Sequence, residues 1–192
     1  MLDTTATNLD AVNRVLGSIG DSPVDTLESP TNVNVINAIK ELEYISRKEQ
    51  SKGWSFNIID SYTLNADTNT HRISWSTRFL SVVDTVGDKV FIHKGAYLYN
   101  LTDQTFTFNN SITVQMILLM DLEELPEVMQ TYIVARTGEM FQMKFLGDQS
   151  LSQALELERR DAWAAIQDYE CSSNTDTFNI WNDEDMQKIR RP

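Results

Sequence analysis

The chain has 192 residues, 41% of them hydrophobic, which suffices for one cored domain or one domain with a sizeable insertion. Its formal net charge of −12 argues against a nucleic-acid-binding surface, because such surfaces work by neutralising phosphates. The single cysteine, Cys171, excludes an internal disulfide, and no stretch approaches an uninterrupted apolar membrane span. The polar, acidic N-terminus is the reverse of a signal peptide, so we expect an intracellular, soluble chain.

Two helices are predicted at the start of the chain. Apolar residues recur every three or four positions over residues 8–18 and again over residues 31–52, which is the period of an amphipathic helix. Pro23 and Pro30 keep the intervening loop extended, and Gly53 is expected to end the second helix.

From Trp54 the apolar period changes to two. Trp54, Phe56 and Ile58 alternate with polar residues, which predicts a strand. Further strands are predicted at 79–83, 89–93, 96–100, 105–108 and 111–120. A turn over residues 93–95 joins two of them and makes the clearest hairpin in the sequence.

The chain then returns to helix. Pro126 suits a first helical turn, and helices are predicted over residues 126–146 and 149–171. Gly147 and Asp148 supply the break between them, so the two helices should form an antiparallel hairpin.

The order of elements predicts an α+β fold. We expect an antiparallel four-helix body from residues 1–53 and 122–171, with an all-β antiparallel insertion of five to six strands at residues 54–121. Residues 172–192 are expected to form a C-terminal tail.

A search for chemistry finds no catalytic, cofactor-binding or metal-binding residues to predict. The seven glycines form no phosphate-binding loop, and no GxSxG motif is present. His71 and His93 have no partners at metal-ligand spacing, and Cys171 has no neighbouring histidine.

Two carboxylate clusters remain. Asp121, Glu123 and Glu124 are interpreted as charges at a helix N-terminus. Residues 183–185 are acidic and lie beside Trp181, an arrangement that in principle suits glycoside hydrolysis. A chain terminus is a poor place to fix two carboxylates at a set separation, so catalysis is kept only as an alternative.

Partner-binding residues are predicted in two places. Phe91, Tyr97 and Tyr99 lie on the predicted hairpin, where they either pack within the sheet or face another chain. The tail carries an apolar patch followed by acidic and then basic residues, and its candidate contacts are Phe178, Ile180, Trp181, Lys188, Arg190 and Arg191.

Four segments carry a resemblance to a known family: residues 9–29, 37–58, 95–100 and 112–136. In these segments the chain resembles tail tubular protein A, the adaptor of short-tailed bacteriophages. The similarity runs from about residue 9 to residue 169. Its most specific parts are the SxGWxFN run at residues 51–57 and the LPE at residues 125–127.

The resemblance implies a homo-dodecameric adaptor ring, a gatekeeper-type head–tail connector between the portal and the nozzle (tail tubular protein B). Tail fibres would attach around the junction of adaptor and nozzle, and DNA would pass through the lumen during ejection without specific binding. It also implies a virion tail protein that assembles in the host cytoplasm, with no membrane partner and no catalytic motif. Two alternatives remain: a tail-associated polysaccharide-degrading hydrolase, and a monomeric binding module that uses the β insertion.

The charge is unevenly distributed along the chain. Residues 122–192 carry 14 acidic and 7 basic side chains, whereas residues 54–121 carry 6 and 4. Solubility accounts for such a surplus in most proteins. For a ring through which DNA passes, the surplus suggests a second hypothesis, in which an acidic lumen repels the duplex.

Overall fold

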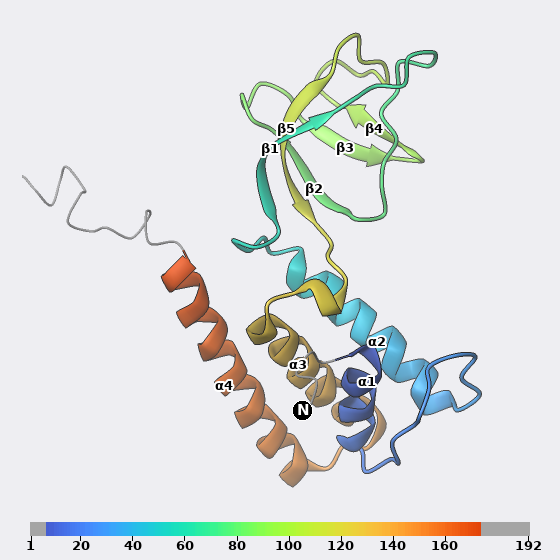
Figure 1. Ribbon diagram of the computed structural model, residues 1–192, viewed down its shortest axis with the longest axis vertical. Helices are drawn as coiled ribbons and strands as arrows, with labels where there is room; N and C mark the ends of the chain where they lie inside the picture. Colours follow the sequence, from blue (N-terminus) through green and yellow to red (C-terminus); the bar gives the residue numbers. More distant parts are fainter. Residues whose placement is uncertain (1–6, 174–192) are drawn as a thin grey trace, which may run out of the picture. The chain divides into compact units, whose positions relative to one another are not determined.

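The computed structural model describes residues 7–173, which contain four α-helices and five antiparallel strands in two small sheets (Figure 1). The elements are α1 (Asn8–Gly17), α2 (Val33–Gln50), β1 (Ile58–Leu64), β2 (Phe79–Asp84), β3 (Phe91–Lys94), β4 (Tyr97–Asn100), β5 (Ile112–Leu118), the 3-10 turn η1 (Leu122–Glu124), α3 (Glu127–Phe145) and α4 (Gln149–Ser173). The chain is therefore mixed α+β, as predicted. Within the described residues, no helix is long and apolar enough to cross a membrane.

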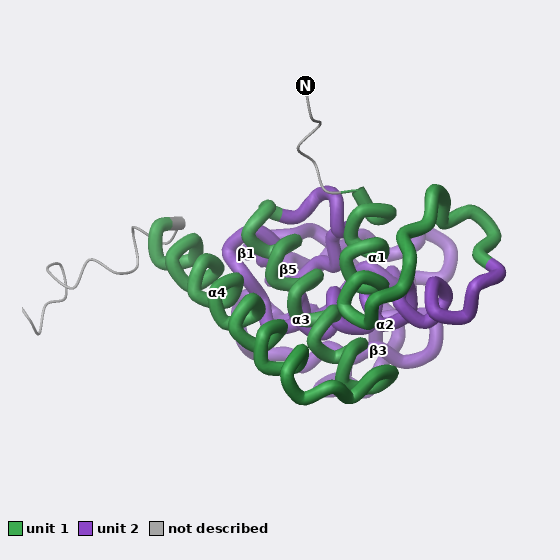
Figure 2. The backbone as a smooth tube through the Cα atoms, turned by 90° about the horizontal axis from the view of Figure 1, so that it is seen from below, with its two compact units in different colours: residues 1–30, 126–192 green, residues 31–125 purple. Residues whose placement is uncertain are grey.

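The chain divides into two compact units (Figure 2). Unit 1 comprises residues 1–30 and 126–192 and contains α1, α3 and α4. Unit 2 comprises residues 31–125 and contains α2, all five strands and η1. The predicted four-helix body is not confirmed, because α2 belongs to the unit that holds the strands.

Unit 1 is built on the packing of α4 along α3. Met129, Ile133 and Phe141 of α3 are fully buried, and α4 contributes the buried residue Ile166. The break between the two helices is closed by Gln142, whose side chain is also fully buried. Its Nε2 donates to the Asp148 carbonyl at 2.8 Å and its Oε1 accepts from Ser152 Oγ at 2.7 Å. A reverse turn of the chain is thus held by the hydrogen bonds of one buried side-chain amide.

One buried charge also joins these two helices. Glu139 of α3 is 7% exposed, and its Oε2 lies 2.5 Å from Arg136 Nη1 and 2.9 Å from Nε of Arg159 on α4. The two guanidinium groups compensate the free-energy cost of burying the Glu139 carboxylate. Removing one of them would leave this buried charge less well compensated and would destabilise the fold. Beside it, the rings of Tyr132 and Trp163 lie 5.2 Å apart.

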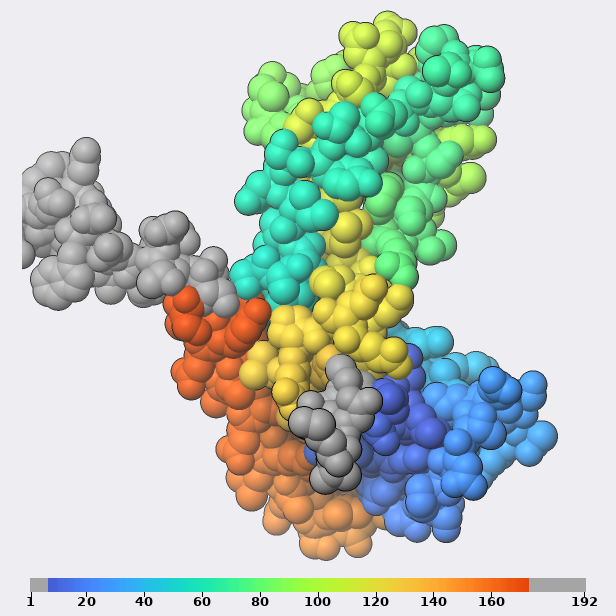
Figure 3. Space-filling view, viewed as in Figure 1, coloured from blue at the N-terminus to red at the C-terminus, as the bar shows by residue number. Residues whose placement is uncertain are grey.

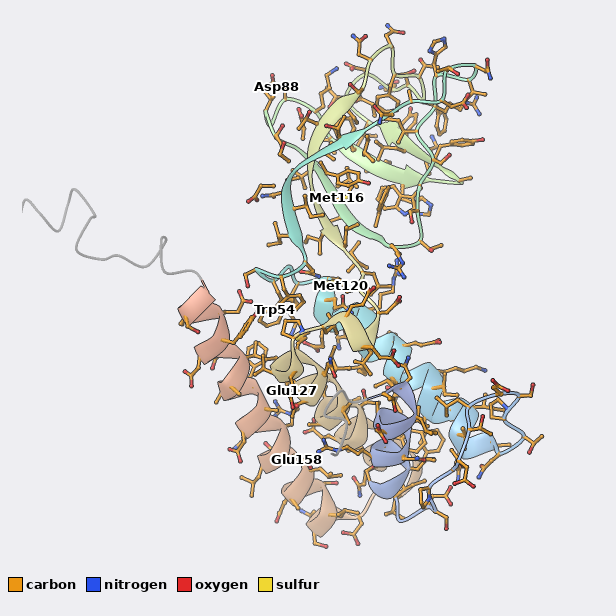
Figure 4. The ribbon with its side chains drawn as sticks, viewed as in Figure 1. Trp54, Asp88, Met116, Met120, Glu127 and Glu158 are labelled. Carbon is orange, nitrogen blue, oxygen red and sulfur yellow. The ribbon has the colours of Figure 1, made fainter. Side chains whose placement is uncertain are left out.

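Unit 2 contains a three-stranded sheet of order β1-β5-β2 and the two-stranded β3–β4 hairpin. Alternate residues of β5 point inward, so Val114 and Met116 are buried while Thr113 and Gln115 are exposed. Met116 is labelled among the strands in Figure 4. The apolar core between the strands consists of Leu64, Ile73, Val82, Phe91, Leu98, Phe108, Val114 and Met116.

The four helices lie within about two residues of their predicted bounds, because long amphipathic segments with clear caps are well determined by sequence. The hairpin is confirmed as well: β3 and β4 pair antiparallel with Lys94 opposite Tyr97. Its turn is displaced, since β3 continues through Lys94 and the two turn residues are Gly95 and Ala96. Gly95 has a φ of 66°, which the first position of such a two-residue turn requires.

Two strand predictions are wrong. Residues 54–57 form a turn, in which the amides of Asn57 and Ile58 both donate to the Trp54 carbonyl at 3.0 Å, and β1 begins only at Ile58. Residues 105–108 make a single bridge between Thr105 and Asn100 instead of a strand. In both places the alternation of aromatic and polar residues arises from loops that pack on a core, not from a pleated strand.

Candidate functional site

The segment that follows α2 fixes this helix to β5 and to the residues after it. We call this region the α2–β5 junction and define it by Gln50, Trp54, Asn57, Leu118 and Met120. Figure 4 labels Trp54 and Met120, which mark its place in the fold. All five residues belong to unit 2, so the junction lies inside one compact unit.

Gln50, at the end of α2, pairs with the backbone of Met120 as a second strand would. Its Nε2 donates to the Met120 carbonyl at 3.0 Å, and its Oε1 accepts from the Met120 amide at 2.8 Å. The side chain is 0% exposed, and Nε2 also reaches Ser46 Oγ at 3.0 Å. A buried amide with all its polar atoms bonded stabilises one geometry and penalises others.

Asn57 completes the junction from the other side. Its Nδ2 donates to the carbonyls of Gln50 and Leu118, both at 3.0 Å, and its Oδ1 accepts from the Trp54 amide at 2.8 Å. The Leu118 amide in turn donates to the Asn57 carbonyl at 2.9 Å. One side chain, 2% exposed, therefore links the end of a helix, the following turn and the end of β5.

Trp54 and Gly53 explain the remainder of the SKGWSFN sequence. The Trp54 indole is buried and its Nε1 donates to the Glu49 carbonyl at 2.8 Å, which satisfies a carbonyl in the last turn of α2. Gly53 has a φ of 79°, and a Cβ atom there would lie 3.0 Å from Cδ1 of Ile117. Only glycine combines this backbone conformation with the close approach of β5.

Arg78 and Arg47 reinforce the same region with charge. Arg78 Nη2 lies 2.5 Å from Asp121 Oδ2, and the Arg78 carbonyl accepts from the Leu119 amide at 2.7 Å. Arg47 of α2 donates from Nη1 to the Thr77 carbonyl at 3.0 Å. The Asp121 carboxylate thus pairs with a cation beside the 3-10 turn that it precedes.

A second feature of unit 2 is an aromatic and cationic surface on one side of the β3–β4 hairpin. Pairing of Lys94 with Tyr97 and of Ile92 with Tyr99 places these four side chains on the same face. Two residues from neighbouring loops join them. We define the hairpin face as Arg72, Ile92, Lys94, Tyr97, Tyr99 and Phe106.

Cation–π contacts order the hairpin face. Lys94 Nζ lies 4.2 Å from the centroid of the Tyr99 ring, and the Tyr99 and Phe106 rings are 4.7 Å apart. The Arg72 guanidinium lies 5.2 Å from the Tyr97 ring. Each such contact contributes about 0.5–1 kcal/mol at an exposed site, so the face is organised without being buried.

The predicted contact residues are therefore divided. Tyr97 and Tyr99 lie half-buried on the hairpin face, whereas Phe91 points to the other side and is 8% exposed in the core. Arg72 and Phe106 were not predicted, since only tertiary packing brings their loops to the hairpin. The six candidate contacts of the tail, Phe178, Ile180, Trp181, Lys188, Arg190 and Arg191, lie outside the described residues and stay predictions.

The shifted pKa values occur at turns and helix starts. Hydrogen bonds from Thr70 lower the pKa of Asp67, and hydrogen bonds from Ser150 and Leu151 lower the pKa of Asp148, which precedes α4. The Lys89 ammonium lowers the pKa of Asp103 and has its own pKa raised by that carboxylate, at an Nζ–Oδ2 distance of 2.9 Å. These exposed groups stabilise loops, and none sits in a cleft as a tuned acid or base would.

Each unit has a surface hollow among its described residues. A groove of about 280 Å³ between α1, α3 and α4 contains one carboxylate, Glu158, which pairs with Arg14 at 2.8 Å. A second hollow of about 240 Å³ lies beside α2, and its lining is Tyr44, Arg47, Lys48, Ser51 and Leu80. Neither holds the pair of carboxylates that glycoside hydrolysis needs. Residues 7–173 also contain no group of three or more histidine, cysteine or acidic side chains placed to bind a metal.

Comparison with known proteins identifies the family. The sequence model of the tail tubular protein family matches residues 9–176. The chain belongs to the tail tubular protein family. The match includes all of unit 2, most of unit 1 and the whole α2–β5 junction. A relative, "Tail tubular protein A" of Klebsiella phage KP34, is 26% identical over 153 residues, which is 79% of this chain and 81% of the relative. A structural role in a phage tail follows for this tail tubular protein.

The junction makes a testable prediction about stability. Replacing Asn57 by alanine leaves two buried carbonyls and one buried amide without their partner, so unfolding should become easier by at least about 2 kcal/mol. Asn109→Ala, in an exposed loop, is the matched control and should change stability by less than about 0.5 kcal/mol. Urea unfolding of both variants measures the difference. Equal midpoints would show that the junction does not stabilise the fold.

Proposed function

We propose that this tail tubular protein is the adaptor of a short-tailed phage. In this proposal it forms a homo-oligomeric ring, dodecameric in the virion, that joins the portal to the nozzle and acts as a gatekeeper-type head–tail connector. The observation that carries the proposal is the family match over residues 9–176, together with the name "Tail tubular protein A" of the relative that covers most of both chains.

The fold supports a role in assembly. A subunit of a closed ring needs two different surfaces, because each copy contacts one neighbour with its front and another with its back. The two compact units supply surfaces of different character. Unit 1 carries 17 acidic and 8 basic residues, whereas unit 2 carries 11 and 8.

Passage of DNA through the ring favours a lumen without attractive charge. A duplex held by many Lys or Arg contacts would slide only against the free energy of those contacts, whereas an acidic wall keeps it away. We therefore propose that part of the acidic surplus lines the channel and that DNA passes during ejection without specific binding. An electropositive lumen in a reconstruction of the ring would contradict this point.

The hairpin face is proposed as the contact with a neighbouring tail component, either the nozzle or a fibre. Tyrosine, phenylalanine and arginine are the residues enriched at the centres of protein interfaces. The cation–π contacts hold these side chains in place before binding, so less conformational freedom is lost when a partner arrives. The described residues give no comparable support to a hydrolase.

Removal of the protein from an infection tests the adaptor role. Phage that lack it should accumulate DNA-filled heads without nozzles or fibres, because the connecting ring is missing. Electron microscopy of the particles, with supply of the wild-type chain from a plasmid as the control, gives the answer. Normally tailed particles in its absence would refute the adaptor proposal.

Charge reversal on the hairpin face tests the partner contact. The double variant Arg72→Glu and Lys94→Glu removes both cations, so particles should retain the adaptor on the portal but lose the nozzle or the fibres. The control Val86→Glu also adds negative charge, at a residue that is 75% exposed in the loop between β2 and β3, and should leave particles intact. Complete particles from the double variant would exclude this face as the contact.

A further inference from the structure

Helix α2 carries a basic stripe on its solvent side. Lys40, Tyr44, Arg47, Lys48 and Ser51 are all exposed, and their spacing of three or four residues places them on one side of the helix. One acidic residue, Glu43, is also exposed and lies between Lys40 and Arg47 at the same spacing, so the stripe carries three cations and one carboxylate. Tyr44 is 59% exposed, which is unusual for a large aromatic ring. Beside it, Ser51 and Leu80 line the hollow of about 240 Å³.

Helix α4 carries a stripe of the opposite charge. Leu157, Asp161, Ala164 and Asp168 are exposed and recur every three or four residues, and Leu157 is 61% exposed. Figure 3 shows the surface of α4, in orange, open to solvent. Arg160, at the edge of the stripe, already pairs with Glu156 at 2.5 Å. Glu158, labelled in Figure 4, pairs with Arg14 and belongs to another side of the helix.

The charges of the two stripes have the same spacing. Lys40 and Arg47 are seven residues apart, as are Asp161 and Asp168, and seven residues span about 10.5 Å of helix. Among the described residues, neither carboxylate makes a hydrogen bond or an ion pair, and the same holds for the Lys40 and Lys48 ammonium groups.

An antiparallel alignment matches all four positions of the α4 stripe and places Lys48 beside the Arg160–Glu156 ion pair. Placing Lys40 opposite Asp168 brings Tyr44 to Ala164, Arg47 to Asp161 and Ser51 to Leu157. The large Tyr44 ring then meets the smallest side chain of the α4 stripe. Leu157 meets the hollow that Ser51 and Leu80 line. A parallel alignment of the same charges would place Leu157 beside Ile36, away from the hollow.

We propose that the α4 stripe of one copy packs antiparallel on the α2 stripe of a second copy, as the contact that closes the ring. The inference rests on the proposed adaptor ring and names its interface. The two stripes belong to different units of the chain, so the contact is head-to-tail and leaves one stripe of each kind open for the next copy. Burial of Tyr44 and Leu157 supplies most of the stability, while the exposed ion pairs set register and association rate.

Complementary charge reversals test the contact. One variant carries Lys40→Glu and leaves Arg47 with its structural bond to Thr77 intact. The other carries Asp168→Lys, at the position placed opposite Lys40. Each is mixed with purified portal, and ring formation is followed by sedimentation velocity. We expect each variant alone to assemble at least tenfold less than the wild type, because like charges then face one another.

Mixing the two variants is the decisive arm. In an equimolar mixture Glu at position 40 of one variant can meet Lys at position 168 of the other, and the unchanged Lys40 and Asp168 meet at the next contact, so assembly should return as an alternating ring. The variant Asp25→Lys has the same change of charge as Asp168→Lys, in an exposed loop, and should assemble like the wild type.

Each of the other outcomes contradicts one of the two proposals, the interface or the adaptor ring. If the wild type assembles and both variants assemble equally well, the stripes are not the interface, although the adaptor proposal stands. If mixing fails but both substitutions in one chain restore assembly, the stripes meet within one chain, and the contact between copies is excluded. If the wild type itself never assembles on the portal, the adaptor proposal fails first.

Discussion

The two buried side-chain amides of the α2–β5 junction are the constraint on which the rest of unit 2 depends. Gln50 and Asn57 are at most 2% exposed, and their hydrogen bonds join a helix end, a turn and the end of a strand. Burying amides is costly unless every donor and acceptor is bonded, so the arrangement tolerates little displacement. It makes α2 and the strands one piece, and a surface on the strands therefore moves with the helix.

This coupling gives the SKGWSFN sequence at residues 51–57 a physical meaning. In SKGWSFN, glycine permits the turn against Ile117, tryptophan satisfies the helix end and asparagine binds β5. None of these residues contributes a reactive group. A structural protein of a phage tail needs rigid connections between its elements more than it needs a cleft, and the described residues contain several such connections.

The elements that depend on local periodicity could be predicted from the sequence. The helices and the β3–β4 hairpin follow from apolar spacing, caps and a glycine turn. The turn at residues 54–57 was misread as a strand, because its aromatic residues alternate while the decisive bonds of Asn57 reach residues far along the chain. Only part of the hairpin face could be predicted from the sequence. Tyr97 and Tyr99 lie on the hairpin itself, whereas Arg72 and Phe106 reach it only through tertiary packing. The sequence also did not predict that α2 belongs to the same compact unit as the strands, because this depends on contacts that no pattern within α2 reveals.

Native mass of the purified protein, alone and mixed with the portal of the same phage, tests the central claim most directly. We predict a large closed oligomer in at least the mixture, present as a stoichiometric complex with the portal ring. A chain that stays monomeric and leaves the portal unbound would contradict the adaptor account.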